Sequence, residues 1–176
     1  LTPSLLNKLH SRHESGRPLR VGLIGAGKFG TMYLSQAHRV PGLHVAGIAD
    51  LSKERIRTAL LRAEWPQEQT DASDMDQAIS TGATWQTDDG MALIRADEIE
   101  VIIEATGDPG AGARHAMAAI YHGKHIVMVN VEADALVGPL LARHAEEAGL
   151  VYSLASGDQP ALICDLVDWA RMNGFG

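Results

Sequence analysis

Three glycines lie where an apolar run of the sequence gives way to a helical pattern. The stretch VGLIGAGKFG, residues 21–30, carries them in the spacing GxGxxG. The first glycine permits a tight turn, the second lets a pyrophosphate approach the backbone, and the third lets a helix pack closely on the strand. The free N–H groups at the start of that helix attract phosphate. The spacing therefore predicts a dinucleotide site formed by Gly25, Ala26, Gly27, Lys28, Phe29 and Gly30.

An acidic residue stands at the end of the next apolar run. The run HVAGIAD ends in Asp50, 20 residues after Gly30, where a carboxylate can accept hydrogen bonds from the adenosine ribose. The alternatives are that Asp50 only caps the following helix and that the glycines serve only turn and packing. Ser52, Lys53 and Arg55 follow closely and could receive a 2′-phosphate if Asp50 turned away. The choice between NAD and NADP is therefore open.

Short apolar runs alternate with helical patterns along most of the chain. Strands are expected over residues 19–24, 43–49, 83–87, 100–105, 125–129 and 150–154, and helices over 28–39, 52–63, 74–80, 89–95, 109–122 and 133–148. This alternation implies right-handed crossovers and a parallel sheet covered on both faces. The predicted fold class is α/β, a doubly wound parallel sheet of the Rossmann type, with an extra N-terminal helix that begins near Thr2 and Pro3.

Three segments are expected. Residues 1–17 form the N-terminal helix, residues 18–155 form the NAD(P)-binding domain, and residues 156–176 form a helix that leads toward a second domain. That last helix is predicted to start near Asp158 and Pro160. Because no further strand pattern follows, we expect this sequence to be the front portion of a longer chain.

Two further strand ends place polar residues at the same edge of the sheet. In an open α/β sheet, ligands bind at the carboxyl ends of the strands, at the switch point between the first and fourth strands. Thr106 and Gly107 end the fourth strand and are expected beside the nicotinamide or its ribose, the alternative being an ordinary turn. Asn130 ends the fifth strand at the same rim. Glu132 and Asp134 follow it, either as rim groups or as acids that complement a helix dipole.

No catalytic acid or base is assigned from the sequence. Lys124 lies at the amino end of the fifth strand, about 20 Å of extended chain from Asn130, and so at the wrong edge of the sheet. Six histidines are most simply interpreted as surface or hydrogen-bonded structural residues. These are His10, His13, His38, His44, His115 and His144.

Composition narrows the class of protein. The 176 residues are 45% hydrophobic, which is enough for the core of one domain. The net charge of -7 argues against nucleic-acid binding, which requires an excess of basic residues. A single cysteine, Cys164, excludes an internal disulfide, and without a signal-peptide pattern a cytoplasmic location is expected. No apolar run approaches the roughly 20 residues that cross a bilayer. The expected partners are a small-molecule substrate and further copies of the chain, with neither nucleic acid nor membrane.

Several stretches together resemble one group of oxidoreductases. RVGLIGAGKFG, GIADLS and VIIEATG are joined by the more specific EADALVGPLLA and SGDQPALICDLVDWAR. From about Pro18 onward the chain is similar to the N-terminal part of homoserine-dehydrogenase-like oxidoreductases that carry a C-terminal SAF domain, a group that includes deoxyxylulose-phosphate-reductoisomerase-like enzymes. The resemblance implies a nicotinamide cofactor and a second domain that supplies most of the substrate site.

The resemblance also bears on the residues after the fifth strand. In homoserine dehydrogenases a lysine follows an asparagine at this place, whereas here Val131 follows Asn130, which argues against homoserine itself. In reductoisomerases acidic residues hold a divalent metal. By that analogy Glu132 and Asp134 are candidate ligands for magnesium or manganese.

The sequence therefore favours an enzyme. The expected function is that of a cofactor-binding domain of an NAD(P)-dependent oxidoreductase that acts on a small polar carbonyl or hydroxyl compound, with or without a phosphate group. One alternative is a non-catalytic NAD(H)-sensing module. Another is an S-adenosylmethionine methyltransferase, which also uses a glycine-rich first turn and an acid after the second strand.

Overall fold

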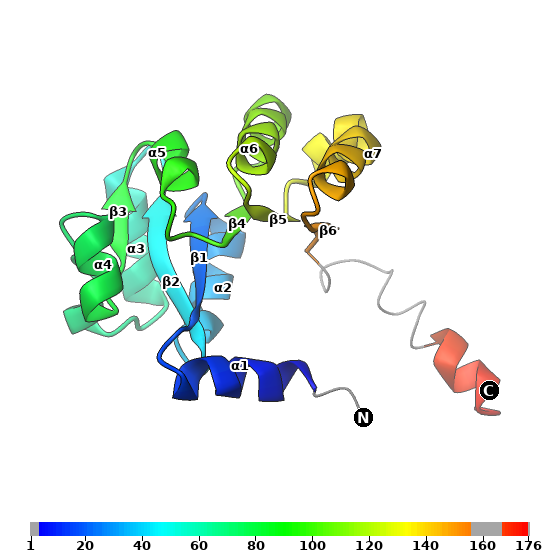
Figure 1. Ribbon diagram of the computed structural model, residues 1–176, viewed down its shortest axis with the longest axis horizontal. Helices are drawn as coiled ribbons and strands as arrows, with labels where there is room; N and C mark the ends of the chain where they lie inside the picture. The colour runs from blue at the N-terminus through cyan, green and yellow to red at the C-terminus, as the bar shows by residue number, and fades with distance from the viewer. Residues whose placement is uncertain (1–3, 156–166, 176) are drawn as a thin grey trace.

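One parallel sheet forms the centre of the protein (Figure 1). The computed structural model describes residues 4–155 and 167–175. Six strands run in the order β3-β2-β1-β4-β5-β6, and every neighbouring pair is parallel. They are β1 (Leu19–Ile24), β2 (Leu43–Ala49), β3 (Trp85–Thr87), β4 (Val101–Glu104), β5 (His125–Met128) and β6 (Tyr152–Leu154). The strand order reverses between β1 and β4, so the predicted doubly wound Rossmann fold is confirmed.

Helices cover both faces of the sheet (Figure 1). One face carries α2 (Lys28–Ala37) and α3 (Lys53–Arg62), and the other carries α4 (Met75–Thr81), α5 (Gly90–Arg95), α6 (Pro109–Tyr121) and α7 (Val131–Glu147). Successive strand residues point to opposite faces. Accordingly, Leu23 belongs to the aliphatic core under α2 and α3, and Ile24 belongs to the core under the other four helices.

Polar side chains mark where most helices begin. Each accepts a hydrogen bond from a first-turn backbone amide, which would otherwise be unpaired. The capping residues are Ser4, Ser52, Asp74, Asp89, Asp108 and Asn130, for α1 (Leu5–Glu14), α3, α4, α5, α6 and α7 respectively. Because Asn130 is the cap, α7 starts at Val131, two residues earlier than the sequence predicted. The structure adds a short 3-10 helix, Gln67–Gln69, that the sequence analysis missed.

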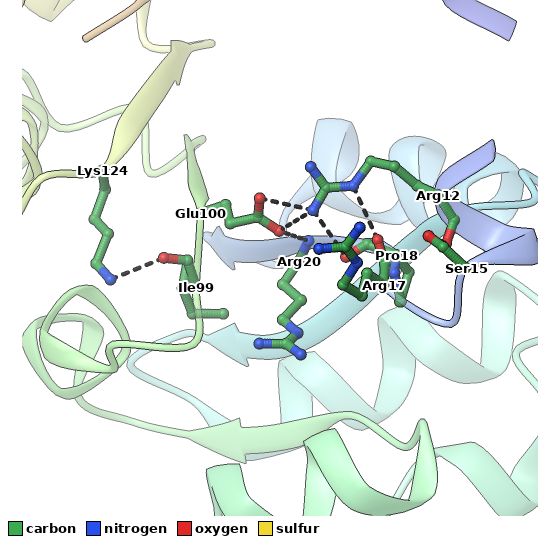
Figure 2. A network of polar contacts seen from close by, with 8 residues as sticks. All are labelled: Arg12, Ser15, Arg17, Pro18, Arg20, Ile99, Glu100 and Lys124. Carbon is green, nitrogen blue, oxygen red and sulfur yellow. Dashed lines mark hydrogen bonds and ion pairs between the residues drawn. The ribbon is translucent and has the colours of Figure 1, made fainter. Parts of the chain in front are cut away.

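An ion pair fixes the N-terminal helix α1 (Leu5–Glu14) at the amino edge of the sheet (Figures 1 and 2). Arg12 Nη2 donates to both carboxylate oxygens of Glu100 at 2.7 Å, and its Nε donates to the carbonyl of Arg17 at 2.9 Å. Glu100, which precedes β4, also accepts from the backbone amide of Arg20 at 3.1 Å. The helix is therefore tied to β1 and β4 at the edge opposite the glycine turn.

Some sequence predictions lie outside the described residues. They include the helix starts proposed at Thr2 and near Asp158, together with Cys164. Residues 167–172 are helical. Across residues 4–155 and 167–175, we find no helix that is both long enough and apolar enough to cross a membrane.

Candidate functional site

A cleft of about 470 Å³ opens at the carboxyl edge of the sheet, where β1, β2 and β4 end. Residues of the glycine turn, the end of β2, the loop before α5 and the first turns of α6 line it, among them Gly27, Asp50, Thr106 and His115. This is the switch point of the strand order, where open α/β sheets bind their ligands. The cleft therefore brings together several residues that the sequence analysis selected.

The three glycines of the turn occupy three different environments. Gly25 has a φ of 105°, and a Cβ on it would lie 2.5 Å from the carbonyl oxygen of Ala105. A Cβ on Gly30 would collide with the carbonyl oxygen of Gly25. By contrast, nothing lies within 4 Å of the Cβ position of Gly27, which faces the cleft. Gly25 and Gly30 are thus required by packing, whereas Gly27 leaves space that the protein itself does not fill.

Helix α2 begins at this turn without a side-chain cap. Its N-cap is Gly27, and no side chain accepts a hydrogen bond from its first-turn amides. The helices α1 and α3 to α7 each have such a cap. Lys28 is exposed and Phe29 is half-buried at the same terminus. Open space at Gly27 and uncapped amides form a cradle that suits an anionic pyrophosphate.

Asp50 joins the end of β2 to the glycine turn. Its Oδ2 accepts from the backbone amide of Ala26 at 2.9 Å, and its Oδ1 accepts from that of Ser52 at 3.0 Å. The cap of α3 is Ser52, so the alternative in which Asp50 is that cap is wrong. Arg55 Nη1 lies 3.3 Å from the Asp50 carboxylate, whose side chain is 5% exposed, while the Arg55 side chain is 60% exposed. A buried carboxylate and a largely exposed cation therefore lie together at the cleft wall.

The residues predicted to contact the cofactor at the ends of β4 and β5 differ in whether they line the cleft. Thr106 lines the cleft, and Gly107 next to it is exposed with a φ of 77°. Asn130 is buried, and its amide group donates to Thr106 Oγ1 at 3.4 Å and to the carbonyl of Asp108 at 2.8 Å. Asn130 is not among the residues that line the cleft, so its structural role is to support Thr106 and to start α7.

Two further residues at this rim were not predicted. Glu104, the last residue of β4, is fully buried, and His115 lies 3.2 Å from it and lines the cleft. His115 is hydrogen-bonded, which agrees with the expectation of a surface or hydrogen-bonded structural histidine, but its place at the cleft was not predicted. One signal in the sequence was the acidic residue that ends the apolar run VIIE, two residues before Thr106. The pairing itself depends on how α6 packs beside β4.

The acidic residues proposed as metal ligands lie in the first turn of α7. Glu132 is exposed, and Asp134 accepts a hydrogen bond from the hydroxyl of Tyr152 at 2.8 Å. Burial together with this carboxylate raises the pKa of Tyr152 above its ordinary value. In the parts of the chain that the structure describes, no group of three or more His, Cys, Asp or Glu side chains could hold a metal ion. A metal at Glu132 and Asp134 stays a prediction.

Lys124 lies at the amino edge of the sheet, as predicted, and is buried there. Its Nζ donates to the carbonyl oxygens of Ala96, Asp97 and Ile99, the last of which is drawn in Figure 2. Burial lowers the pKa of Lys124, and neighbouring carboxylates oppose that shift. These three contacts close the end of α5, which is a structural role.

Comparison with known proteins agrees with this geometry. Residues 19–129 match the GFO/IDH/MocA family model, described as an oxidoreductase family with an NAD-binding Rossmann fold. An inositol 2-dehydrogenase from Saccharopolyspora erythraea is 31% identical over 125 residues, which cover 65% of this chain and 37% of that protein.

Solved structures show the same fold. Biliverdin reductase from Synechocystis, solved with biliverdin and NADP+, has a TM-score of 0.61 at 20% identity, covering 89% of this chain and 42% of its own. A 3-ketoreductase from Actinomadura kijaniata, solved with NADP, has a TM-score of 0.61 at 19% identity, covering 87% and 43%. The chain thus spans about two fifths of the length of these relatives. Because the family match runs from β1 to the end of β5, the chain belongs to the GFO/IDH/MocA family of oxidoreductases with an NAD-binding Rossmann fold.

Proposed function

We propose that this chain is the cofactor-binding domain of an NAD(P)-dependent oxidoreductase that acts on a small polar carbonyl or hydroxyl compound, with or without a phosphate group. The observation that carries the proposal is the uncapped start of α2 beside the empty space at Gly27. A pyrophosphate would accept from the free amides of α2, and the positive end of the helix dipole would favour its charge. Family membership supports the oxidoreductase class and the nicotinamide cofactor.

The residues around the cleft have distinct tasks in this proposal. When bound, the nicotinamide ring exchanges a hydride with a carbon of the substrate. Gly25 and Gly30 shape the turn, Asp50 holds that turn through Ala26, and Thr106 marks the wall at the end of β4. None of these groups is an evident proton donor to a substrate, so the chain supplies binding and orientation. We expect the proton donor to come from a second domain of the whole protein.

The Asp50 and Arg55 pair suits a cleft that accepts both NAD and NADP. The Asp50 carboxylate is already held by two backbone amides, and the largely exposed guanidinium of Arg55 can turn toward a 2′-phosphate. The family is described as NAD-binding, while two structural neighbours were solved with NADP. Both facts support dual use.

The substrate class rests on relatives and on sequence stretches. The relative named inositol 2-dehydrogenase supports a polyhydroxylated substrate. The narrower resemblance to homoserine-dehydrogenase-like enzymes with a SAF domain depends on EADALVGPLLA and SGDQPALICDLVDWAR, which lie beyond residue 129, where the family match ends. That narrower assignment, the cytoplasmic location and the homo-oligomer stay predictions.

Calorimetry and a turnover assay test the proposal together. Residues 1–176 should bind NADH and NADPH. They should neither reduce NAD+ or NADP+ in the presence of polyols nor oxidise NADH or NADPH in the presence of phosphorylated sugars or amino-acid semialdehydes. A proton donor or an oxyanion-stabilising group commonly contributes on the order of a hundredfold or more in rate, and we assign no such group among the described residues of the cleft. Absence of dinucleotide binding would refute the proposal, and turnover by this chain would refute the division of labour between domains. If the whole protein binds NADH but turns over no substrate, the sensor alternative is favoured.

A further inference from the structure

A buried carboxylate beside the cleft has no task in the proposed function. Glu104 is 0% exposed, and its Oε1 accepts from the Thr106 hydroxyl at 2.6 Å. His115 Nδ1 lies 3.2 Å from the same oxygen. Among the described residues, Glu104 Oε2 has no hydrogen-bond partner. A buried carboxylate with an unpaired oxygen costs stability, so its presence points to a role other than holding the fold together.

The hydrogen bonds around Glu104 have a fixed direction. The backbone amide of Ala133 donates to Asn130 Oδ1 at 3.0 Å, which places the NH₂ group of Asn130 toward Thr106. The Thr106 hydroxyl accepts that hydrogen bond and donates one of its own to Glu104 Oε1. A carboxylate oxygen has no proton to donate, so we assign the proton of the contact between Oε1 and His115 to Nδ1. The hydrogen bonds therefore form one chain from the backbone amide of Ala133 on α7 to His115 on α6.

The second ring nitrogen of His115 stands at the cleft. His115 Nε2 lies 3.4 Å from the position that a Cβ on Gly90 would occupy, and both residues line the cleft. In a neutral imidazole with the proton on Nδ1, Nε2 has a free lone pair and accepts hydrogen bonds. A ligand group that meets this nitrogen must therefore bring its own hydrogen, as a hydroxyl or an amide N–H does and an ionised phosphate oxygen does not.

We propose that Glu104 is a positioning residue that keeps His115 in the Nδ1–H tautomer, and that His115 Nε2 accepts a hydrogen bond from a hydroxyl or amide group of the bound dinucleotide. The inference rests on the proposed function, because it requires the cleft to hold NAD(H) or NADP(H). It assigns a binding contact to His115 and an orienting one to Glu104. The polar chain from Asn130 through Thr106 supplies the direction of the hydrogen bonds.

Nitrogen NMR of the chain with ¹⁵N-labelled histidine tests the positioning role directly. Spectra are recorded in mildly alkaline buffer, and signals are assigned with His115→Asn. We expect His115 to carry its proton on Nδ1 in the wild type and in Glu104→Gln, whose amide oxygen can still accept. Glu104→Leu, which removes both acceptor oxygens, should lose this tautomer preference. A wild-type ring protonated on Nε2 overturns the proposal, as does a tautomer that Glu104→Leu leaves unchanged.

Calorimetry with NADH tests the binding contact. His115→Asn keeps a donor toward Glu104 but lacks Nε2, so NADH affinity should fall about three- to tenfold, the usual effect of one hydrogen bond. Glu104→Leu should cause a similar loss of NADH affinity. The double variant, which combines His115→Asn with Glu104→Leu, should lose little more affinity than either single variant. Glu104→Gln and the exposed His122→Asn, the matched control, should bind as the wild type does. Unchanged affinity in His115→Asn overturns the contact, whereas a wild type that binds neither NADH nor NADPH refutes the proposed function itself.

Discussion

The backbone amide of Ala26 donates to the carboxylate of Asp50 at 2.9 Å, so the end of β2 and the glycine turn after β1 hold each other in place. The same carboxylate accepts from the amide of Ser52, which caps α3. A change at Asp50 is therefore felt in the turn and in the following helix. Substitution of Asp50 should therefore change stability as well as cofactor choice.

The glycines should respond differently to substitution. In Gly27→Val the new side chain enters open space at a backbone φ of -75°, so the free energy of unfolding should change by less than about 0.5 kcal/mol. It occupies the cradle, however, and NADH affinity should fall on the order of tenfold or more. Gly30→Ala should instead cost about 1–3 kcal/mol of stability, because its Cβ collides with the Gly25 carbonyl. Urea unfolding measures the stability of both variants, and calorimetry measures their NADH affinity. A Gly30→Ala variant that is as stable as the wild type but does not bind NADH would contradict the structural role of Gly30.

Cofactor choice should depend on Asp50 and Arg55. Asp50→Ser removes a negative charge that opposes a 2′-phosphate, so the ratio of NADPH to NADH affinity should rise. Since two backbone amides lose a charged acceptor, stability should also fall by about 1.5–3 kcal/mol. Arg55→Met should lower NADPH affinity and spare NADH. Arg57→Met, an exposed arginine of the same helix, is the control; an equal ratio in all four proteins would mean that neither residue sets the choice.

Stability should decline in mild acid because of His44. Burial is the main cause that lowers the pKa of His44 below 6.5, and the charge of Arg20 adds to it, while the hydrogen bond to the Ala83 carbonyl opposes it. The folded pKa is below the unfolded one, so the folded state binds fewer protons. Its contribution is complete above about pH 6.5 and is lost as the pH falls through the folded pKa.

The measurement for His44 is urea unfolding at several pH values between about 7.5 and 5. His44→Gln, which can still donate to Ala83, should weaken the pH dependence. His10→Gln, at an exposed position of α1, should leave it unchanged. A pH dependence that is the same in both variants would assign the effect to another group.

The N-terminal helix should detach when its ion pair is removed. Arg12 forms an ion pair with both carboxylate oxygens of Glu100, and the two side chains are 40% and 37% exposed. Arg12→Met should therefore cost only about 1 kcal/mol of global stability. Hydrogen exchange in residues 5–14 should nevertheless become much faster, because that arginine binds α1 to Glu100, which directly precedes β4. Lys8→Met, exposed on the same helix, is the control. Protected α1 amides in Arg12→Met would show that the helix is held by other contacts.

The sequence by itself determined the order of the elements and the place of the cleft. Strand and helix periodicities are local, and GxGxxG can be recognised because its glycines are required within one turn: Gly25 by its positive φ and Gly30 by its contact with Gly25. Thr106 could be placed at the rim because parallel strands bring their carboxyl ends to one edge. These inferences need only short-range geometry and the rules of sheet topology.

Tertiary structure alone decided which polar groups meet. Asp50 reaches Ala26 across 24 residues, and Asn130 reaches Thr106 across another 24, so no local pattern announces either contact. His115 became a cleft residue only because α6 packs beside β4 and turns one ring nitrogen to Glu104. Hydrogen bonds have a range of about 3 Å. The partners of these hydrogen bonds are therefore fixed by how the helices and strands pack. Composition and residue spacing predict the order of the strands but not these contacts.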